Sequence, residues 1–378
     1  MKEQLKLTEV ETNELLRALK GITAPNSASE SAKIATTDAH ALPQSKFPLA
    51  PVLYFMLRSI GCPDLGRAEK MAWAMPFAFQ DKAFILADEK FGLRLYCDSS
   101  ILAEGNDIKL AVSQVMNRLE KGQKFIERRV LRPFADEQMK NGEILVKNQY
   151  GALRETYEYF RQGASLAYSG QGRNRRPDRI FAEEAEGFHN TTAMISAYFS
   201  LLEHLLVLVH PFTRNSAVGD RLVRFIGDRW SAKFREVFDV NSDARAKYFY
   251  DRLVGFSEEY RNTYAHGGFD KARATVAFRI PGVAWLPAAL SDVRKSPHYG
   301  LIPVTASEFS TICQLLDQFD EWIEDTVPHG IEWARAGLNV SFDEAFRNRL
   351  HHALENGNFN QFIEREAHVA DMHANMDY

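Results

Sequence analysis

Cysteine is scarce in this sequence. Its 378 residues include three cysteines, Cys62, Cys97 and Cys313, which lie far apart. An odd and scattered set of this kind provides neither a disulfide framework nor a cysteine-based zinc site. The cysteine content therefore points to a reducing compartment.

Long apolar runs and a strong charge of one sign are also missing. The N-terminus is mixed in charge and lacks the apolar core of a signal peptide. The most apolar stretch, residues 193–209, contains Glu203 and His204 and is too short and polar for a membrane span. The formal net charge of −4 means that any contact with nucleic acid requires local basic patches. We expect a cytoplasmic protein with no membrane partner.

Two kinds of chemical site are missing as well. The sequence has no glycine-rich phosphate-binding loop ending in Gly-Lys-Ser/Thr, so hydrolysis of nucleoside triphosphates is not indicated. Histidines gather near the C-terminal end, but their spacing matches no familiar metal site. We therefore expect neither a metal nor a cofactor.

The residue patterns predict a mainly α-helical chain in four parts. These are an N-terminal helix with a flexible linker (1–46), a smaller mixed α/β region (47–142), a helical domain (143–340) and a polar helical tail (341–378). The linker is assigned to residues 21–46, which are rich in Ala, Ser, Thr and Pro and have no aromatic residue.

The α/β region combines a hairpin with helices. Residues 77–86 and 91–97 are rich in Phe, Leu, Ile and Tyr and predict two strands, with a turn at Ala-Asp-Glu-Lys between them. Apolar residues at 52–60 predict a short helix. A longer helix follows to about residue 140, with a break or kink near Pro133.

Helical periodicity dominates the larger domain. The predicted helices are 143–168, 186–210, 217–239, 244–266 and 307–326. In the last of these, apolar residues recur at three- and four-residue steps and form one continuous stripe. Residues 276–305 contain four prolines and β-prone pieces, so we expect a loop with short strands inserted between helices.

The helix 244–266 carries the most distinctive motif. It ends in Arg261-Asn262-Thr263-Tyr264-Ala265-His266, followed by Gly267-Gly268, which can supply the left-handed residue that ends a helix. On a regular α-helix, Phe249, Leu253, Phe256, Tyr260 and Tyr264 form an apolar stripe. Arg261, Asn262 and His266 then lie off this stripe, with Arg261 roughly 100° to one side. They project onto a face left for solvent, a ligand or a second subunit.

This motif resembles the signature of the HEPN superfamily, in which Arg, a polar residue and a later His lie near the end of a helix. The resemblance covers roughly residues 145–340 and implies a HEPN-like helical bundle. It further implies a metal-independent endoribonuclease of prokaryotic stress or antiphage defence. Such enzymes are homodimers that bring two Arg/His sets together across one groove, and an antitoxin or a sensor protein can be a further partner.

The residue types suit RNA cleavage. His266 can exchange a proton near neutral pH, as base toward a ribose 2′-hydroxyl or as acid toward the leaving oxygen. Arg261 is permanently charged and can bind phosphate oxygens through two donors. Asn262 can orient the imidazole or contact the phosphate. We take Arg261, Asn262 and His266 as the candidate catalytic residues.

Two other features bear on function. The segment 170–179 has four arginines, Arg173, Arg175, Arg176 and Arg179, which either bind RNA phosphates or belong to a solvated loop. Glu203-His204 lies among leucines, as an internally paired buried group or as support for the active site.

Two other functional classes stay open. One is a non-catalytic HEPN-like module for dimerisation or binding, and the other is a nucleotide-binding regulatory protein. Cleavage of RNA in EDTA that requires Arg261 and His266 distinguishes the enzyme from both.

Overall fold

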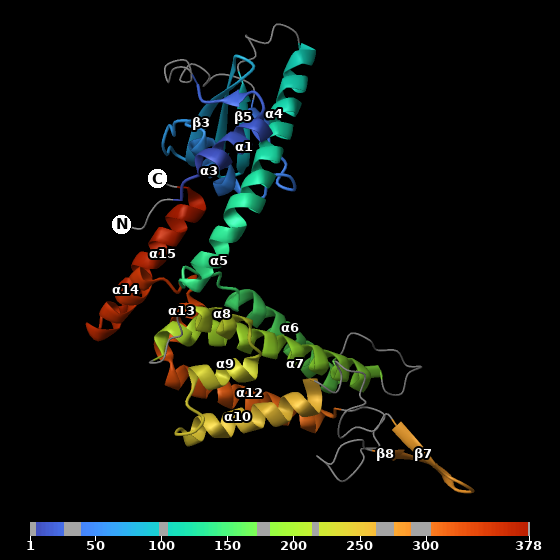
Figure 1. Cartoon of the computed structure of the whole chain (residues 1–378). Helices are drawn as coiled ribbons and strands as arrows, with labels where there is room; N and C mark the ends of the chain where they lie inside the picture. Colours follow the sequence, from blue (N-terminus) through green and yellow to red (C-terminus); the bar gives the residue numbers. More distant parts are fainter. Residues whose placement is uncertain are drawn as a thin grey trace. The chain divides into compact units, whose positions relative to one another are not determined.

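The computed structural model of the chain describes residues 5–25, 39–97, 105–171, 182–213, 219–261, 276–288 and 304–376. The chain forms two compact units, drawn in Figure 1. Unit 1 comprises Met1–Gln138 together with Glu364–Tyr378, and unit 2 comprises Met139–Ile363. The protein is mainly helical, with a small antiparallel sheet in unit 1, and this confirms the predicted fold class at that level.

Unit 1 is built on a five-stranded antiparallel sheet in the order β1-β3-β4-β5-β2. Its strands are β1 (Ile22–Thr23), β2 (Ala39–Ala41), β3 (Met71–Phe79), β4 (Lys82–Glu89) and β5 (Gly92–Cys97). Alternate residues of a strand face the same side of a sheet. Phe77 of β3 and Phe84 of β4 are directly paired across the two strands, so they share one face, where their rings stack at 5.7 Å within the core of the unit.

Helices add further residues to this core. They are α1 (Glu9–Leu19), α3 (Ala50–Ser59) and α4 (Gly105–Ile126), together with the π-helical turn η3 (Glu127–Leu131). The next helix, α5 (Arg132–Lys140), has no buried residue. α1 begins with a capping box in which Thr8 and Glu11 satisfy each other's backbone amides. The irregularity expected near Pro133 is the π-turn η3, which directly precedes the helix that contains this proline.

Two predictions for unit 1 were wrong, that of a single strand at 77–86 and that of a flexible linker at 21–46. Residues 77–86 are not one strand, because Gln80 and Asp81 have φ values of 51° and 60° and form the turn between β3 and β4. β4 then continues to Glu89, so the Ala-Asp-Glu-Lys segment is mostly strand. The predicted linker 21–46 contains β1 and β2, the two outer strands of the sheet. Their backbone partners are β3 and β5, which the composition of the segment cannot indicate.

Unit 2 consists of packed helices (Figure 1). They are α6 (Tyr150–Tyr168), α7 (Ala182–Val209), the 3-10 turn η4 (His210–Phe212), α8 (Asp220–Gly227), α9 (Trp230–Val237), α10 (Ala244–Phe256), the π-helical turn η5 (Ser257–Arg261), α12 (Ala306–Thr326), α13 (Pro328–Arg335) and α14 (Glu344–Glu355). Two short pairs of strands complete the unit, β6 (Leu145–Val146) with β9 (Val340–Ser341) and β7 (Val276–Ile280) with β8 (Ala284–Ala288). The strand pair β7–β8 confirms the predicted β insertion between helices.

An aromatic cluster lies between α9, α10 and α12. The ring of Phe249 is 5.1 Å from that of Trp322, and Phe234 is 6.0 Å from both Trp322 and Phe319. All four residues are buried. The predicted stripe of α12 is thus the core face of that helix.

The boundaries of two predicted helices differ from the structure. The helix predicted at 143–168 begins at Tyr150, because Leu145–Val146 pairs with β9 nearly two hundred residues later in the sequence. The helix predicted at 217–239 is divided into α8 and α9 after Gly227. Glycine is a weak helix former, and Asp228 adopts an extended conformation there.

α7 is long and apolar enough to cross a membrane by length and composition, contrary to our expectation from residues 193–209. However, 61% of its most apolar window is buried inside the protein, as in the core helix of a soluble protein. α7 packs along α6 and also contacts α9 and α13. Its hydrophobicity is explained by this central position.

The C-terminal segment forms two helices, α14 and α15 (Phe359–Asn375), as predicted for a polar helical tail. The end of this tail belongs to unit 1. There the amide of Lys70 donates to the carbonyl of Met376, and Lys90 Nζ donates to Asn375 Oδ1 at 3.0 Å.

Candidate functional site

The helix that leads into the Arg-Asn motif is firmly positioned. Asp243 caps the start of α10 by accepting hydrogen bonds from the amides of Arg245 and Ala246. Further along, Phe249 packs against Trp322 of α12, and Phe256 stacks on Phe199 of α7 at 5.9 Å. The backbone that reaches Arg261 is therefore held by two neighbouring helices.

The apolar stripe predicted on this helix is confirmed over its described length. Phe249, Leu253, Phe256 and Tyr260 are all buried, and the ring of Tyr260 lies 5.2 Å from that of Phe256. The fifth member, Tyr264, lies outside the described residues.

The helix is not a regular α-helix up to the motif. Residues Ser257–Arg261 form the π-turn η5, in which hydrogen bonds span five residues instead of four. A constant step of 100° per residue therefore does not describe Ser257–Arg261, although Tyr260 is still buried with the rest of the stripe. Turns of this kind occur frequently at functional sites, and η5 ends at the first residue of the motif.

Most of the predicted site residues lie outside the described part of the chain. For Arg261 the structure describes only the backbone, and Asn262 and His266 are not described. The four arginines of the basic loop, Arg173, Arg175, Arg176 and Arg179, also lie outside it. Their roles remain predictions.

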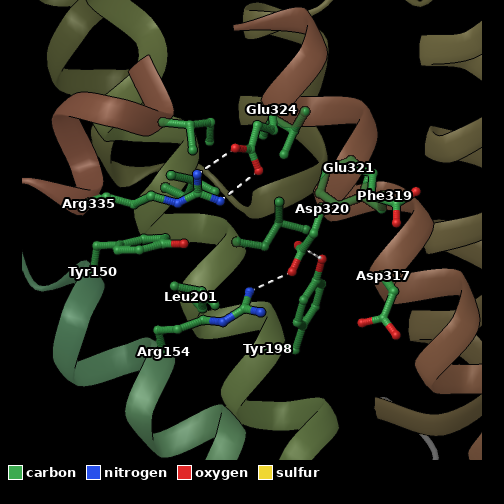
Figure 2. A pocket seen from close by; sticks show the side chains of 14 residues that line it. Tyr150, Arg154, Tyr198, Leu201, Asp317, Phe319, Asp320, Glu321, Glu324 and Arg335 are labelled. Atoms are coloured by element: carbon green, nitrogen blue, oxygen red, sulfur yellow. Dashed lines mark hydrogen bonds and ion pairs between the residues drawn. The ribbon is translucent and has the colours of Figure 1, made fainter. Parts of the chain in front are cut away.

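A cavity of about 350 Å³ lies among α6, α7, α12 and α13 of unit 2. Its lining residues are Tyr150, Arg154, Tyr198, Leu201, Leu202, Leu205, Asp317, Phe319, Asp320, Glu321, Ile323, Glu324, Ile331 and Arg335. Figure 2 shows two ion pairs that bridge this space. Arg335 holds Glu324 through two bonds of 2.5 and 2.6 Å, and Arg154 bonds Asp320 at 2.5 Å.

The deeper bridge includes a tyrosine. The hydroxyl of Tyr198 donates to Asp320 Oδ1 at 2.7 Å, while Arg154 bonds the other carboxylate oxygen (Figure 2). Burial, followed by the charge of Asp320, raises the pKa of Tyr198 well above its usual value. The phenol thus stays protonated near neutral pH and cannot act as a general base.

A second arginine of α6 repeats this arrangement. Arg161 lies two turns beyond Arg154 and holds Asp317 through bonds of 2.5 and 2.6 Å, one turn before Asp320 on α12. It also donates to the hydroxyl of the buried Tyr157 at 3.0 Å. These ion pairs join α6 to α12 across the bundle, so we interpret the polar side of the cavity as structural. The seven-residue spacing of the two arginines was a signal that sequence reasoning missed.

Glu203 and His204 contact different partners. His204 Nε2 accepts a hydrogen bond of 2.9 Å from the amide of Gln149, which directly precedes α6. Burial, with a smaller contribution from Lys233, lowers the pKa of His204 and favours the neutral imidazole that this bond requires. Glu203 instead lies 3.4 Å from the buried ammonium group of Lys233. Among the residues that the structure describes, these bonds give the pair a structural role in joining α6 and α9 to α7.

Within the described ranges, no group of three or more His, Cys, Asp or Glu side chains is arranged to hold a metal ion. No protein-family model, curated protein or solved structure matches the chain. The functional assignment therefore depends on the motif itself and on the helix that carries it.

Proposed function

We propose that the protein is a metal-independent endoribonuclease of HEPN type, that unit 2 is its HEPN-like bundle, and that it acts in the cytoplasm in stress or antiphage defence. The observation that carries the proposal is the anchored helix α10–η5, which includes Arg261, the first residue of the motif. A catalytic arginine needs a fixed backbone to position its guanidinium group on a phosphate. The packing of Phe249 and Phe256 provides this support for the residues that follow.

The proposed reaction uses the motif residues directly. The ribose 2′-oxygen attacks the adjacent phosphorus, and the bond from phosphorus to the 5′-oxygen breaks. The 2′-hydroxyl loses a proton and the leaving 5′-oxygen gains one; His266 accepts the first or donates the second, while Arg261 neutralises the charge that develops on the phosphate oxygens. The products are a cyclic 2′,3′-phosphate and a free 5′-hydroxyl group. By analogy with HEPN enzymes, two copies of the chain supply two Arg/His sets to one groove.

Cleavage of labelled RNA in EDTA tests this proposal. We expect the parent protein to cleave, and His266→Ala and Arg261→Ala each to lower the rate at least about a hundredfold, as for other proton-transfer groups and charge-stabilising donors. Light scattering on the active preparation should give twice the mass of one chain.

Two exposed residues provide matched controls. Arg252→Ala removes an arginine from the same helix, and His351→Ala removes a histidine from α14; both should cleave at the parental rate. Circular dichroism confirms that each variant is folded. Cleavage that persists in both motif variants, or that requires a divalent metal, contradicts the proposal. Dimers that cleave no RNA favour the non-catalytic module.

A further inference from the structure

The strand pair β7–β8 forms a hairpin with an exposed tip. Its register pairs Arg279 with Trp285 and Ile280 with Ala284, which leaves a three-residue turn. In this turn Gly282 has a φ of 79°, a conformation that favours glycine, and the amide of Val283 donates to the carbonyl of Ile280. Figure 1 shows the two strands as the orange ribbon of unit 2.

Trp285 differs from the other tryptophans. Trp73, Trp230, Trp322 and Trp333 are buried, whereas 64% of the Trp285 surface is exposed to solvent. A large indole ring in water forgoes the free energy that burial would contribute. Tryptophan is enriched among the residues that contribute most to binding at interfaces.

An arginine shares the exposed face with this tryptophan. Arg279 and Trp285 are directly opposite in an antiparallel pair, so their side chains leave the same face with Cβ atoms about 5 Å apart. Arg279 is exposed as well. The stretch from Arg279 to Trp285 contains this one cation and no acidic residue. It combines a flat aromatic ring with a positive charge.

We propose that this hairpin binds unpaired RNA, with one base stacked on Trp285 and a neighbouring phosphate bound by Arg279. Aromatic rings stack on any base, and arginine binds phosphate oxygens. The bases of a duplex are stacked on each other, so the hairpin selects single-stranded segments. This inference rests on the proposed function, because it names the form of RNA that the ribonuclease would bind.

Charge favours RNA over a protein partner for this surface. The sequence around the hairpin, residues 270–300, has an excess of basic residues although the whole chain is acidic. The basic residues are Lys271, Arg273, Arg279, Arg294 and Lys295, against the acidic residues Asp270 and Asp292. An anionic polymer is attracted to such a segment.

The test measures RNA binding by the full chain with His266→Ala as the parent, in EDTA, so that no cleavage disturbs the equilibrium. Fluorescence anisotropy compares a labelled single strand with the same strand annealed to its complement. We expect Trp285→Ala to weaken binding of the single strand about tenfold, the usual effect of losing one stacked base. Trp285→Phe keeps a ring and should recover most of this loss.

Arg279→Ala should weaken binding and lower the dependence on salt by about one phosphate contact. The matched control is Phe91→Ala, which removes a side chain that is 84% exposed, in the β4–β5 turn of unit 1. This variant should bind like the parent.

Two results would overturn the inference. One is equal affinity of Trp285→Ala and its parent for the single strand, and the other is no preference for the single strand over the duplex. A Trp285→Ala protein that binds RNA normally but loses its dimeric mass identifies a protein interface instead. Because binding is read without turnover, an inactive wild-type protein contradicts the proposed function and leaves this test unaffected.

Discussion

His210 is a buried titratable residue in the core of unit 2. Its ring lies 4.2 Å from that of Phe225 and 6.2 Å from that of Phe342. Burial, with a smaller contribution from Arg221, lowers the pKa of His210 to about 4. The side chain is therefore neutral in the folded protein at physiological pH, as a buried imidazole among rings requires.

The low pKa of His210 predicts acid sensitivity. In the unfolded chain this histidine binds a proton below its ordinary pKa of about 6.5, whereas in the folded protein it does so only below about 4. Stability is thus complete above the higher value and falls as the pH decreases toward the lower one. The limiting loss from this residue is about 3 kcal/mol. His204, whose pKa is also lowered, contributes in the same direction.

Urea unfolding between pH 7 and pH 4, followed by tryptophan fluorescence, measures this effect. His210→Gln keeps a polar side chain that does not titrate, and its stability should decrease less steeply with acid than that of the parent. The same slope in both proteins would show that His210 titrates normally.

At the level of elements, the start of α6 depends on residues far away in sequence. Asn148 Nδ2 donates to the carbonyls of Ala334 and Leu338, both at 3.0 Å, and its Oδ1 accepts from the amide of Tyr150. His204 accepts a hydrogen bond from the amide of Gln149, the residue between Asn148 and Tyr150. Asn148, which lies one residue before the N-cap Gln149, thus binds the first amide of α6 and also ties this helix to the end of α13.

Replacing Asn148 with alanine removes all three of its side-chain bonds. We expect a loss of about 2 kcal/mol in the free energy of unfolding, because the amide and the carbonyls lose partners in a half-buried site. Urea denaturation provides the measurement. Asn360→Ala, at an exposed position of α15, is the control and should change stability by less than about 0.5 kcal/mol. Similar values for the two variants would mean that water replaces the bonds of Asn148.

The predicted bounds agree with the structure for α12, where capping and apolar residues within or next to the helix determine them. α12 was expected at 307–326 and spans Ala306–Thr326, because Thr305 and Glu308 form a capping box and the apolar stripe is continuous. The start of α6 was misplaced because its determinants, β9 and His204, are distant in sequence. The π-turn η5 was not predicted either, since a buried stripe through Tyr260 is compatible with both helix types.

The candidate catalytic residues stay a prediction. Arg261 and His266 are selected from the sequence because their chemistry and their expected position near a helix end suit RNA cleavage. The sequence did not indicate the ion pairs of Arg154 and Arg161 with α12, which depend on how two helices meet. The exposure of Trp285 likewise depends on the tertiary fold, because its apolar neighbours in the sequence would suggest a buried side chain.

At the scale of the whole molecule, the two units do not follow the order of the chain. The residue patterns predict a boundary between 47–142 and 143–340 and one tail at 341–378. The structure divides the chain after Gln138 and assigns the last residues, from Glu364 onward, to unit 1. Contacts such as that of Lys70 with Met376 join distant segments and leave no pattern in the sequence.

Each unit contains at least one buried cysteine, whose reactivity can indicate when that unit unfolds. Cys62 and Cys97 lie in unit 1 and Cys313 lies in unit 2, and none of these three buried cysteines is in a disulfide. Burial, partly offset by nearby arginines, raises the pKa of Cys62 to about 12 and that of Cys313 to about 11. The native thiols of Cys62 and Cys313 are therefore both shielded and protonated, so alkylating reagents react with them only after local or global unfolding.

Pulsed alkylation with peptide mass spectrometry can thus follow the opening of both units in the same chain, without an added probe. Phe84→Ala, which opens a cavity in the core of unit 1, should speed the labelling of Cys62 more than that of Cys313. Equal acceleration at both thiols would mean that the units unfold together. The alkylation rates of these three buried cysteines thus measure how often each unit opens.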